Sequence, residues 1–308
     1  MRSTPPSEVF SRAEALSYGC TGSALDRAVR SGRVHRLRRG QFTVAERAEH
    51  PRLVGVAAAR ACAGSVVSHR SAALLHRLPV LNHPRRPELT VAPMQTGDVA
   101  GALLHRATLR HIDVSEVDGA LVTSVSRTLV DIGRSASAGC AVVAIDAALH
   151  RGAVDLGAIE NVLCACWNWP GIRRAVRAVD RADASAESPL ESISRLVIGW
   201  LGLPAPRLQA QLHDELGMFV GRADFYWPEY GVVGEADGLA KYDSRAVLLD
   251  EKRRQESLEA LGLVVIRWDW SDVTRRPHLL RQRISWAFER GQRRDRSGLP
   301  RQWSVRVA

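Results

Sequence analysis

Apolar residues at helical spacing predict two short helices near the start of the chain. The first pattern begins at about residue 11 and ends at a glycine-containing break. The second runs from about Ser23 to Ser31, where Gly32 provides a stop signal. Apolar residues at Val34, Leu37 and Phe42 then flank the turn-forming Arg39-Gly40 pair, which predicts a β-hairpin. Residues 1–50 are therefore expected to contain two helices followed by a basic hairpin.

Helical and strand-like patterns alternate between about residues 51 and 180. The helical patterns are "LVGVAAARACA", "SAALLHRL" and "CAVVAIDAALH", and the strand-like ones are "ELTVA", "ALLHRA" and "LVTS". This alternation predicts a mixed α/β domain. Its histidines show no metal-like spacing and are expected at the surface or half-buried: His69, His76, His83 and His105.

A polar segment rich in small residues, "VDRADASAESPLES" at 179–192, has the composition of a linker that leads into a helix. Ser188 is expected as the N-cap, Pro189 as the first helical residue, and Glu191 as the third residue, forming a capping box. A domain boundary is therefore expected here, and residues 188–308 form the last of three predicted domains. The fold class is α/β throughout.

Two strand-like runs flank "PEYG" at 228–231, whose Pro228 and Gly231 are turn formers. If these four residues are the loop of a hairpin, Asp224 lies directly opposite Glu235. A two-residue loop at 229–230 keeps that pairing, whereas a loop with an odd number of residues breaks it. Opposed side chains on one face are about 5 Å apart at Cβ, and like charges there are unfavourable without a cation between them.

A metal ion is the expected cation for this carboxylate pair. Mg²⁺ takes carboxylate oxygens together with waters and substrate phosphate, so Asp224 and Glu235 are the expected ligands, with Mn²⁺ as the alternative ion. Asp237 shares a strand face with Glu235 and is expected to pair with Arg222. Lys241 follows within reach, where an ammonium can stabilise charge on phosphate. The alternative is a hairpin whose surface acids are neutralised by Arg222 and Lys241.

The segment from 188 to about 290 resembles the PD-(D/E)XK nucleases, most closely the very-short-patch-repair-like endonucleases. The matching pieces are "SPLES" with Glu191, "DFYWP" with Asp224, "EADG" with Glu235 and Asp237, and "DEKRRQESLEALGLVVIRW". The resemblance implies a restriction-endonuclease-like α/β domain in which Asp224 and Glu235 hold the metal and Glu191 contributes from its helix. The lysine of the family motif is Asp237 here, so Lys241 or Lys252 must replace it, or the fold persists without catalysis.

Charge favours a nucleic-acid partner. The 308 residues carry a formal charge of +10, and the apolar share of 45% and charged share of 25% are ordinary for a folded protein. Lysine occurs only at Lys241 and Lys252, so arginine supplies the basic character, and arginine favours phosphate. No signal peptide or membrane span is visible, so a cytoplasmic location without a membrane partner is expected. Five scattered cysteines are expected as reduced, mostly buried thiols.

Two helices and a basic hairpin within residues 1–50 predict a winged helix-turn-helix, in which the second helix enters the major groove of DNA. The arginines expected to contact DNA lie on that helix and hairpin: Arg27, Arg30, Arg33, Arg36, Arg38 and Arg39. The alternative is a solvated arginine face on a small helical domain. The first 150 residues or so, including "SVVSHRSAALLHRLPV" and "VDGALVTSVSRTLVDIGRSA", resemble the AbiEi-type antitoxins, which implies a DNA-binding regulator with a cognate toxin protein as partner.

Two functions are therefore expected. In the first, the protein is a Mg²⁺-dependent DNA endonuclease that its winged helix positions on DNA. In the second, it is an antitoxin-like transcriptional regulator with a catalytically inert nuclease fold.

Overall fold

The computed structural model describes residues 8–44, 46, 49–95, 101–213, 216–237 and 255–293. The chain divides into two compact units, Met1–Asp180 and Arg181–Ala308. This division lies within the segment 179–192 that was predicted as a linker. Both units combine helices with β-sheet, as the α/β prediction requires.

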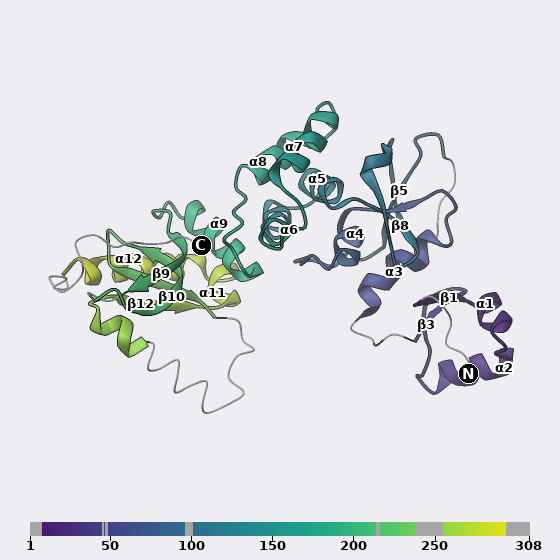
Figure 1. Cartoon of the computed structure of the whole chain (residues 1–308), viewed down its shortest axis with the longest axis horizontal. Coiled ribbons are helices and arrows are strands. Elements are labelled where there is room, and N and C mark those ends of the chain that lie inside the picture. The colour runs from purple at the N-terminus through teal and green to yellow at the C-terminus, as the bar shows by residue number, and fades with distance from the viewer. Residues whose placement is uncertain are drawn as a thin grey trace. The chain divides into compact units, whose positions relative to one another are not determined.

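The first unit begins with two helices and a small antiparallel sheet (Figure 1). The strand order is β1-β3-β2, and the elements are β1 (Val9–Ser11), α1 (Arg12–Ser17), α2 (Gly22–Arg30), β2 (His35–Arg38) and β3 (Gln41–Thr43). Ser11 and Thr21 cap the two helices by accepting bonds from backbone N–H groups. The predicted second helix and hairpin are confirmed, with Gly40 adopting a positive φ of 77° in the turn. β1 was not predicted, because three residues are too few to show an alternating pattern.

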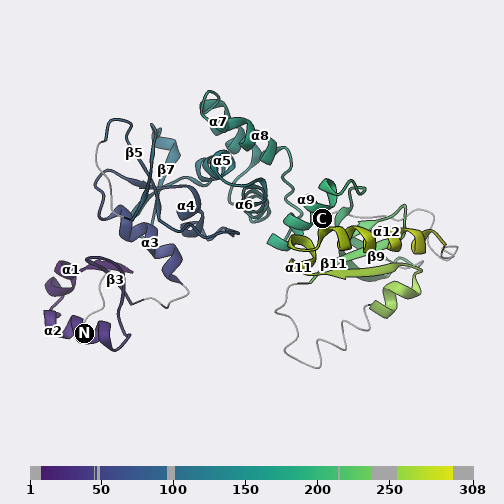
Figure 2. The ribbon, with the colours of Figure 1, turned by 180° about the vertical axis from the view of Figure 1, so that it is seen from behind.

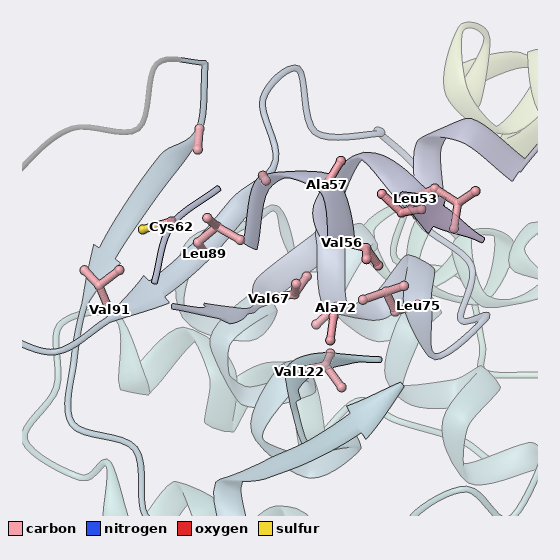
Figure 3. Close-up of a cluster of buried hydrophobic side chains, with 14 residues drawn as sticks. Leu53, Val56, Ala57, Cys62, Val67, Ala72, Leu75, Leu89, Val91 and Val122 are labelled. Carbon is pink, nitrogen blue, oxygen red and sulfur yellow. The ribbon is translucent and has the colours of Figure 1, made fainter. Parts of the chain in front are cut away.

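A five-stranded mixed sheet, in the order β6-β5-β4-β8-β7, forms the middle of this unit. Its strands and two covering helices are α3 (His50–Ala59), β4 (Val66–Val67), α4 (His69–Leu75), β5 (Glu88–Val91), β6 (Leu103–Arg106), β7 (Val114–Val117) and β8 (Ala120–Thr123). Figure 3 shows how Leu53 and Val56 of α3 and Leu75 of α4 meet Val67 and Val122 of the sheet. Burying such side chains stabilises the unit by about 1.5–3 kcal/mol each.

The segments before and after residue 50 share a core and ion pairs. Val9 of β1 is buried in the same cluster as Leu53, and Leu37 of β2 packs against it. The buried guanidinium of Arg52 pairs with Glu8 and Glu49, and also with Asp118. The segments predicted as separate domains, residues 1–50 and 51–180, consequently belong to one compact unit.

Four helices complete the first unit: α5 (Val125–Ser135), α6 (Ala138–His150), α7 (Leu156–Ala165) and α8 (Ile172–Val179). They gather beside the sheet in both views (Figures 1 and 2). α5 and α8 cross at Gly133, where an added Cβ would lie 2.8 Å from the Cα of Ala175. A glycine is required there because the two backbones approach too closely for any side chain.

One histidine expectation is wrong. His69 was expected at the surface or half-buried, but it is 5% exposed, and its ring stacks on that of His105 with centroids 3.6 Å apart. The burial of His69 depends on tertiary structure. His69 begins α4 one residue after the buried strand β4, and this position directs its side chain into the unit. The cysteines fit the prediction, since all five are free thiols and Cys164 alone among them is exposed.

The second unit is built on a four-stranded sheet in the order β12-β11-β10-β9. Its elements are α9 (Pro189–Trp200), β9 (Arg207–His213), β10 (Phe219–Trp227), β11 (Val232–Ala236), β12 (Val264–Trp268), α11 (Trp270–Thr274) and α12 (Pro277–Arg293). β9, β10 and β11 are antiparallel, whereas β12 runs parallel to β11. Residues 255–260, before β12, are helical. Trp227 pairs with Val232 and Phe225 with Gly234, so the predicted register of the hairpin is confirmed.

Aromatic side chains fix β11 against its neighbours. Trp268 of β12 lies against Phe225, with ring centroids 5.0 Å apart, and a Cβ at Gly234 would overlap the Trp268 ring. The indole Nε1 of Trp268 donates to Ser194 Oγ at 2.7 Å, which ties α9 to the sheet. α12 lies along the sheet in both views (Figures 1 and 2) and contributes Phe288 to a contact with Trp227. These contacts hold the strands that carry the predicted site residues.

Within the described part of the chain, no helix is both long enough and apolar enough to cross a membrane.

Candidate functional site

A cleft of about 620 Å³ opens in the second unit between the start of α9 and strand β10. Its lining residues come from the α9 N-terminus, from β10, from the end of β11 and from α11: Glu187 to Glu191, Phe219 to Arg222, Asp224, Ala236 and Trp270. Two of the predicted site residues, Glu191 and Asp224, line this cleft. They are 33 positions apart in the sequence and are brought together by the packing of α9 on the sheet.

Glu191 is held in place by the cap of α9. Ser188 is the N-cap, as predicted, and its side chain accepts the N–H of Glu191 at 3.2 Å. In the predicted capping box, the Glu191 side chain would accept the backbone N–H of Ser188. Its Oε2 instead accepts the N–H of Glu187 at 3.0 Å. The same oxygen accepts Nε2 of Gln209 at 2.7 Å, and the Glu191 side chain is buried. The carboxylate thus joins the segment before α9 to strand β9 of the sheet.

Asp224 is positioned by the hairpin. Its Oδ2 accepts the backbone N–H of Ala236 on β11 at 3.0 Å. Its Oδ1 lies 3.5 Å from Nε2 of Gln209, at the limit of a hydrogen bond. One amide nitrogen therefore lies between the carboxylates of Glu191 and Asp224.

Gln209 is the site residue that the sequence did not reveal. It lies in β9, where Leu208, Ala210 and Leu212 form the buried apolar positions. Gln209 is itself 4% exposed, and its backbone has a φ of 49°, which is unusual for a residue other than glycine. Its Oε1 is buried and accepts no hydrogen bond from any described residue. β9 reads "RLQAQLH", with polar residues at every second position, so nothing in this stretch distinguishes Gln209 from its polar neighbours.

Glu235 and Asp237 meet an arginine from β12. Arg267 is the register partner of Glu235 in the parallel pair, and their side chains approach to 3.3 Å. The Nε of Arg267 also lies 3.8 Å from Asp237. Arg222, the predicted partner of Asp237, forms an ion pair with Glu187 at 2.7 Å. Arg267 was not predicted, because the parallel pairing of β12 with β11 is non-local and leaves no mark in the spacing of residues 222–237.

The donor atoms around the cleft fit a hard cation. Mg²⁺ commonly binds one or two carboxylates and completes its shell with water and phosphate, and Glu191 and Asp224 supply two such carboxylates. The two carboxylates both attract positive charge, and the NH₂ group of Gln209, with its partly positive hydrogens, lies between them. Among the described residues, no three His, Cys, Asp or Glu side chains form a metal-holding group. Lys241 and Lys252 lie outside the described residues.

The predicted DNA-contacting arginines lie on α2 and the following hairpin in the first unit. Five of them are exposed, and Arg38 is half-buried: the exposed ones are Arg27, Arg30, Arg33, Arg36 and Arg39. Asp26 is the acidic residue of α2, and its hydrogen bond with Arg12 lowers the pKa of its carboxyl group. Arg36 also lies over the ring of Phe42, 5.5 Å from its centroid. These five exposed arginines, named here the arginine surface, all lie between residues 27 and 39 of the first unit.

Comparison with known proteins relates the chain to two relatives. No protein-family model matches it. Two curated proteins of Mycobacterium tuberculosis, uncharacterized protein MT2308 and uncharacterized protein Rv2248, each align at 32% identity over 179 residues. The alignment covers 58% of this chain and 66% of each relative, just under two thirds of the relative's length. The chain is therefore similar to these proteins over part of its length.

Proposed function

We propose that this chain binds DNA through its first unit and hydrolyses DNA phosphodiesters at the cleft of its second unit. The observation that carries the proposal is the meeting of Glu191 and Asp224 around Gln209 in one open cleft. Two carboxylates that share a solvent-accessible space are a common means of binding a divalent ion for phosphoryl chemistry.

The order of elements in the second unit supports the same proposal. A helix, three antiparallel strands, a further helical segment and a strand parallel to the third follow one another along the chain. This order agrees with the restriction-endonuclease-like domain that the resemblance to the PD-(D/E)XK nucleases implies. The helix bearing Glu191, the strand bearing Asp224 and the strand bearing Glu235 are α9, β10 and β11 of that order.

Glu191 and Asp224 are the residues that would hold Mg²⁺, or Mn²⁺ as the alternative ion, and Glu235 remains a candidate from the adjoining strand. When bound, such an ion would supply Lewis-acid stabilisation of the phosphate and a more acidic water. The residues of this chain would orient the ion through the N–H of Ala236 and the amide of Gln209, which fix the two carboxylates. Lys241 is proposed to stabilise phosphate charge.

The test is incubation of the full-length protein with linear and supercoiled DNA in the presence of Mg²⁺ or Mn²⁺. Asp224→Asn and Glu191→Gln are expected to lower the cleavage rate at least 100-fold, because each removes a charged ligand while keeping the shape of the side chain. Glu289→Gln, an exposed change on α12, is the control and should cut like the wild type. Cleavage that survives in both cleft variants would show that the activity lies elsewhere.

A second candidate function rests on Arg267. This guanidinium lies beside both Glu235 and Asp237, so an internal cation already occupies the part of the site where the metal and the motif lysine were expected. The alternative is an antitoxin-like transcriptional regulator, in which the arginine surface binds operator DNA and the second unit contacts a cognate toxin protein. Salt-sensitive duplex binding without cleavage, in both Mg²⁺ and Mn²⁺, would favour this function over the first.

A further inference from the structure

A second pocket, of about 500 Å³, lies in the first unit, and nothing in the proposed function uses it. It is lined by the ends of β5 and β6, the start of α4, one face of α5, and the turn before α8. The residues that matter for the argument are His69, Thr90, His105, Arg106, Asn168 and Trp169. We name it the histidine pocket.

Two polar groups in this pocket have no hydrogen-bond partner. Thr90 and His105 are register partners on the parallel strands β5 and β6. Thr90 is 1% exposed, and among the described residues none bonds Thr90 Oγ1 or the buried Nε2 of His105. Buried polar groups are nearly always paired in folded proteins, so these two atoms require a partner from outside the chain.

The backbone at His69 is held in an unfavourable conformation. His69 has a φ of 52°, in the left-handed region, and such a residue is retained only where its surroundings fix it. Its Nδ1 lies 2.9 Å from Ser68 Oγ, and its ring stacks on His105. The stack fixes the plane of the His105 ring at the wall of the pocket.

The charge of the pocket favours an anion. Of the described residues that line it, three are arginines and one is an aspartate, Asp131. Arg127 and Arg134 both pair with Asp131, and both guanidiniums lie over the ring of Trp169. Arg106 adds a further positive charge at the end of β6. A ligand with hydrogen-bond acceptors and negative charge matches this lining, whereas a cationic ligand is repelled.

We propose that the histidine pocket binds a phosphate group, which accepts hydrogen bonds from Thr90 Oγ1, His105 Nε2 and the guanidinium of Arg106. A tetrahedral oxyanion supplies several acceptors at once and satisfies both orphaned groups. The Asn168 amide and the flat face of Trp169 then adjoin whatever the phosphate carries. The proposal does not depend on nuclease activity in the second unit.

Binding is expected to tighten as the pH falls. Burial lowers the pKa of His69 and of His105, and an anion beside the rings favours their protonated forms. The charges that face the two rings are Glu88 on β5, Arg70 on α4, and Arg127, Asp131 and Arg134 on α5. Because the lowered pKa of each ring places its protonation below the ordinary histidine value of 6.5, phosphate should bind more tightly near pH 5 than near pH 7.

The test is calorimetric titration of the full-length protein with inorganic phosphate, with AMP, with adenosine and with a 5′-phosphorylated single-stranded oligonucleotide. Inorganic phosphate is expected to bind, and adenosine is not. Tighter binding by AMP would assign the ligand as a mononucleotide. Tighter binding by the oligonucleotide than by the same oligonucleotide without its 5′-phosphate, which the arginine surface would bind equally well, would assign it as a nucleic-acid end. Absence of binding by all three phosphate-bearing probes would overturn the proposal.

The decisive variant is Thr90→Val, which removes the hydroxyl and keeps the shape of the side chain. Because that hydroxyl has no partner, the variant should fold with unchanged or higher stability, yet bind phosphate about tenfold more weakly. Thr128→Val is the matched control, since the Thr128 hydroxyl bonds Thr123 O and Thr123 Oγ1. It should lower stability and leave phosphate affinity unchanged. A Thr90→Val protein that loses stability, or that binds phosphate as the wild type does, would refute the assignment.

Discussion

The arginine surface of α2 and its hairpin gives a quantitative prediction for DNA binding. Five exposed arginines lie on it, and each guanidinium that neutralises one phosphate releases condensed counterions. The logarithm of the binding constant should then fall against the logarithm of salt concentration with a slope of about −4.5. Between about 50 and 200 mM salt the affinity should fall about 500-fold.

Replacing two of these arginines tests the assignment. Arg27 lies in the last turn of α2 and Arg39 in the hairpin turn, and both side chains are exposed. The double variant Arg27→Ala, Arg39→Ala retains three of the five, so the slope should become about −2.7 and the loss over the same salt range about 40-fold. Fluorescence anisotropy of a labelled duplex, titrated at several salt concentrations, measures both quantities.

The control removes the same charge from other surfaces. Arg173 on α8 and Arg281 on α12 are exposed, and the double variant Arg173→Ala, Arg281→Ala lowers the net charge by the same two units. It should keep the slope of the wild type if DNA contacts the arginine surface. An equal reduction of the slope in both double variants would mean that DNA binding follows net charge alone. An unchanged slope in Arg27→Ala, Arg39→Ala would refute the placing of DNA on the arginine surface.

Three further predictions concern the first unit. Gly133→Ala should lower stability by about 1–3 kcal/mol, because the new Cβ meets Ala175 at 2.8 Å; an unchanged melting temperature would contradict this close crossing. Arg127→Leu should destabilise by about 1–3 kcal/mol, because the two buried aspartates that Arg127 bonds lose their shared donor, although Asp113 keeps Arg110 and Asp131 keeps Arg134. Hydrogen exchange in α5 measures that loss, and protection equal to the wild type would argue against it. Since burial lowers the pKa of His69 and His105, the folded state resists their protonation, and stability should fall as the pH drops below the ordinary histidine value of 6.5. His105→Gln should reduce the acid sensitivity seen in thermal melts, and identical pH profiles would exclude this cause.

Local chemistry explains which parts of the fold were predictable. The turn formers Pro228 and Gly231 define the loop of the β10–β11 hairpin, so the pairing of Trp227 with Val232 follows from the sequence. Ser188 likewise marks the start of α9, because a hydroxyl before a proline and an acidic residue favours an N-cap. The strands β1, β4, β7 and β9 were not predicted. The first three have two to four residues, too few to show a clear period, whereas β9 alternates apolar and polar residues over its full length.

The residues that complete the candidate site come from non-local strand pairing. Gln209 reaches Glu191 and Asp224 because β9 pairs with β10, and Arg267 reaches Glu235 because β12 pairs in parallel with β11. Neither pairing has a signature in the spacing of the acids themselves. The sequence therefore predicted the candidate acids, whereas the partners of those acids became visible only in the sheet.

These two partners have different electrostatic consequences for the acids. Arg267 brings a full positive charge to Glu235 and Asp237, and such compensation weakens the attraction of that pair for a metal ion. The amide of Gln209 satisfies hydrogen-bonding capacity at Glu191 and Asp224 without neutralising either carboxylate. The proposed divalent cation is consequently expected on the side of the site that faces the cleft. Asp224 belongs to both the predicted pair and the observed one, so its replacement tests the proposed catalysis whichever acid accompanies it.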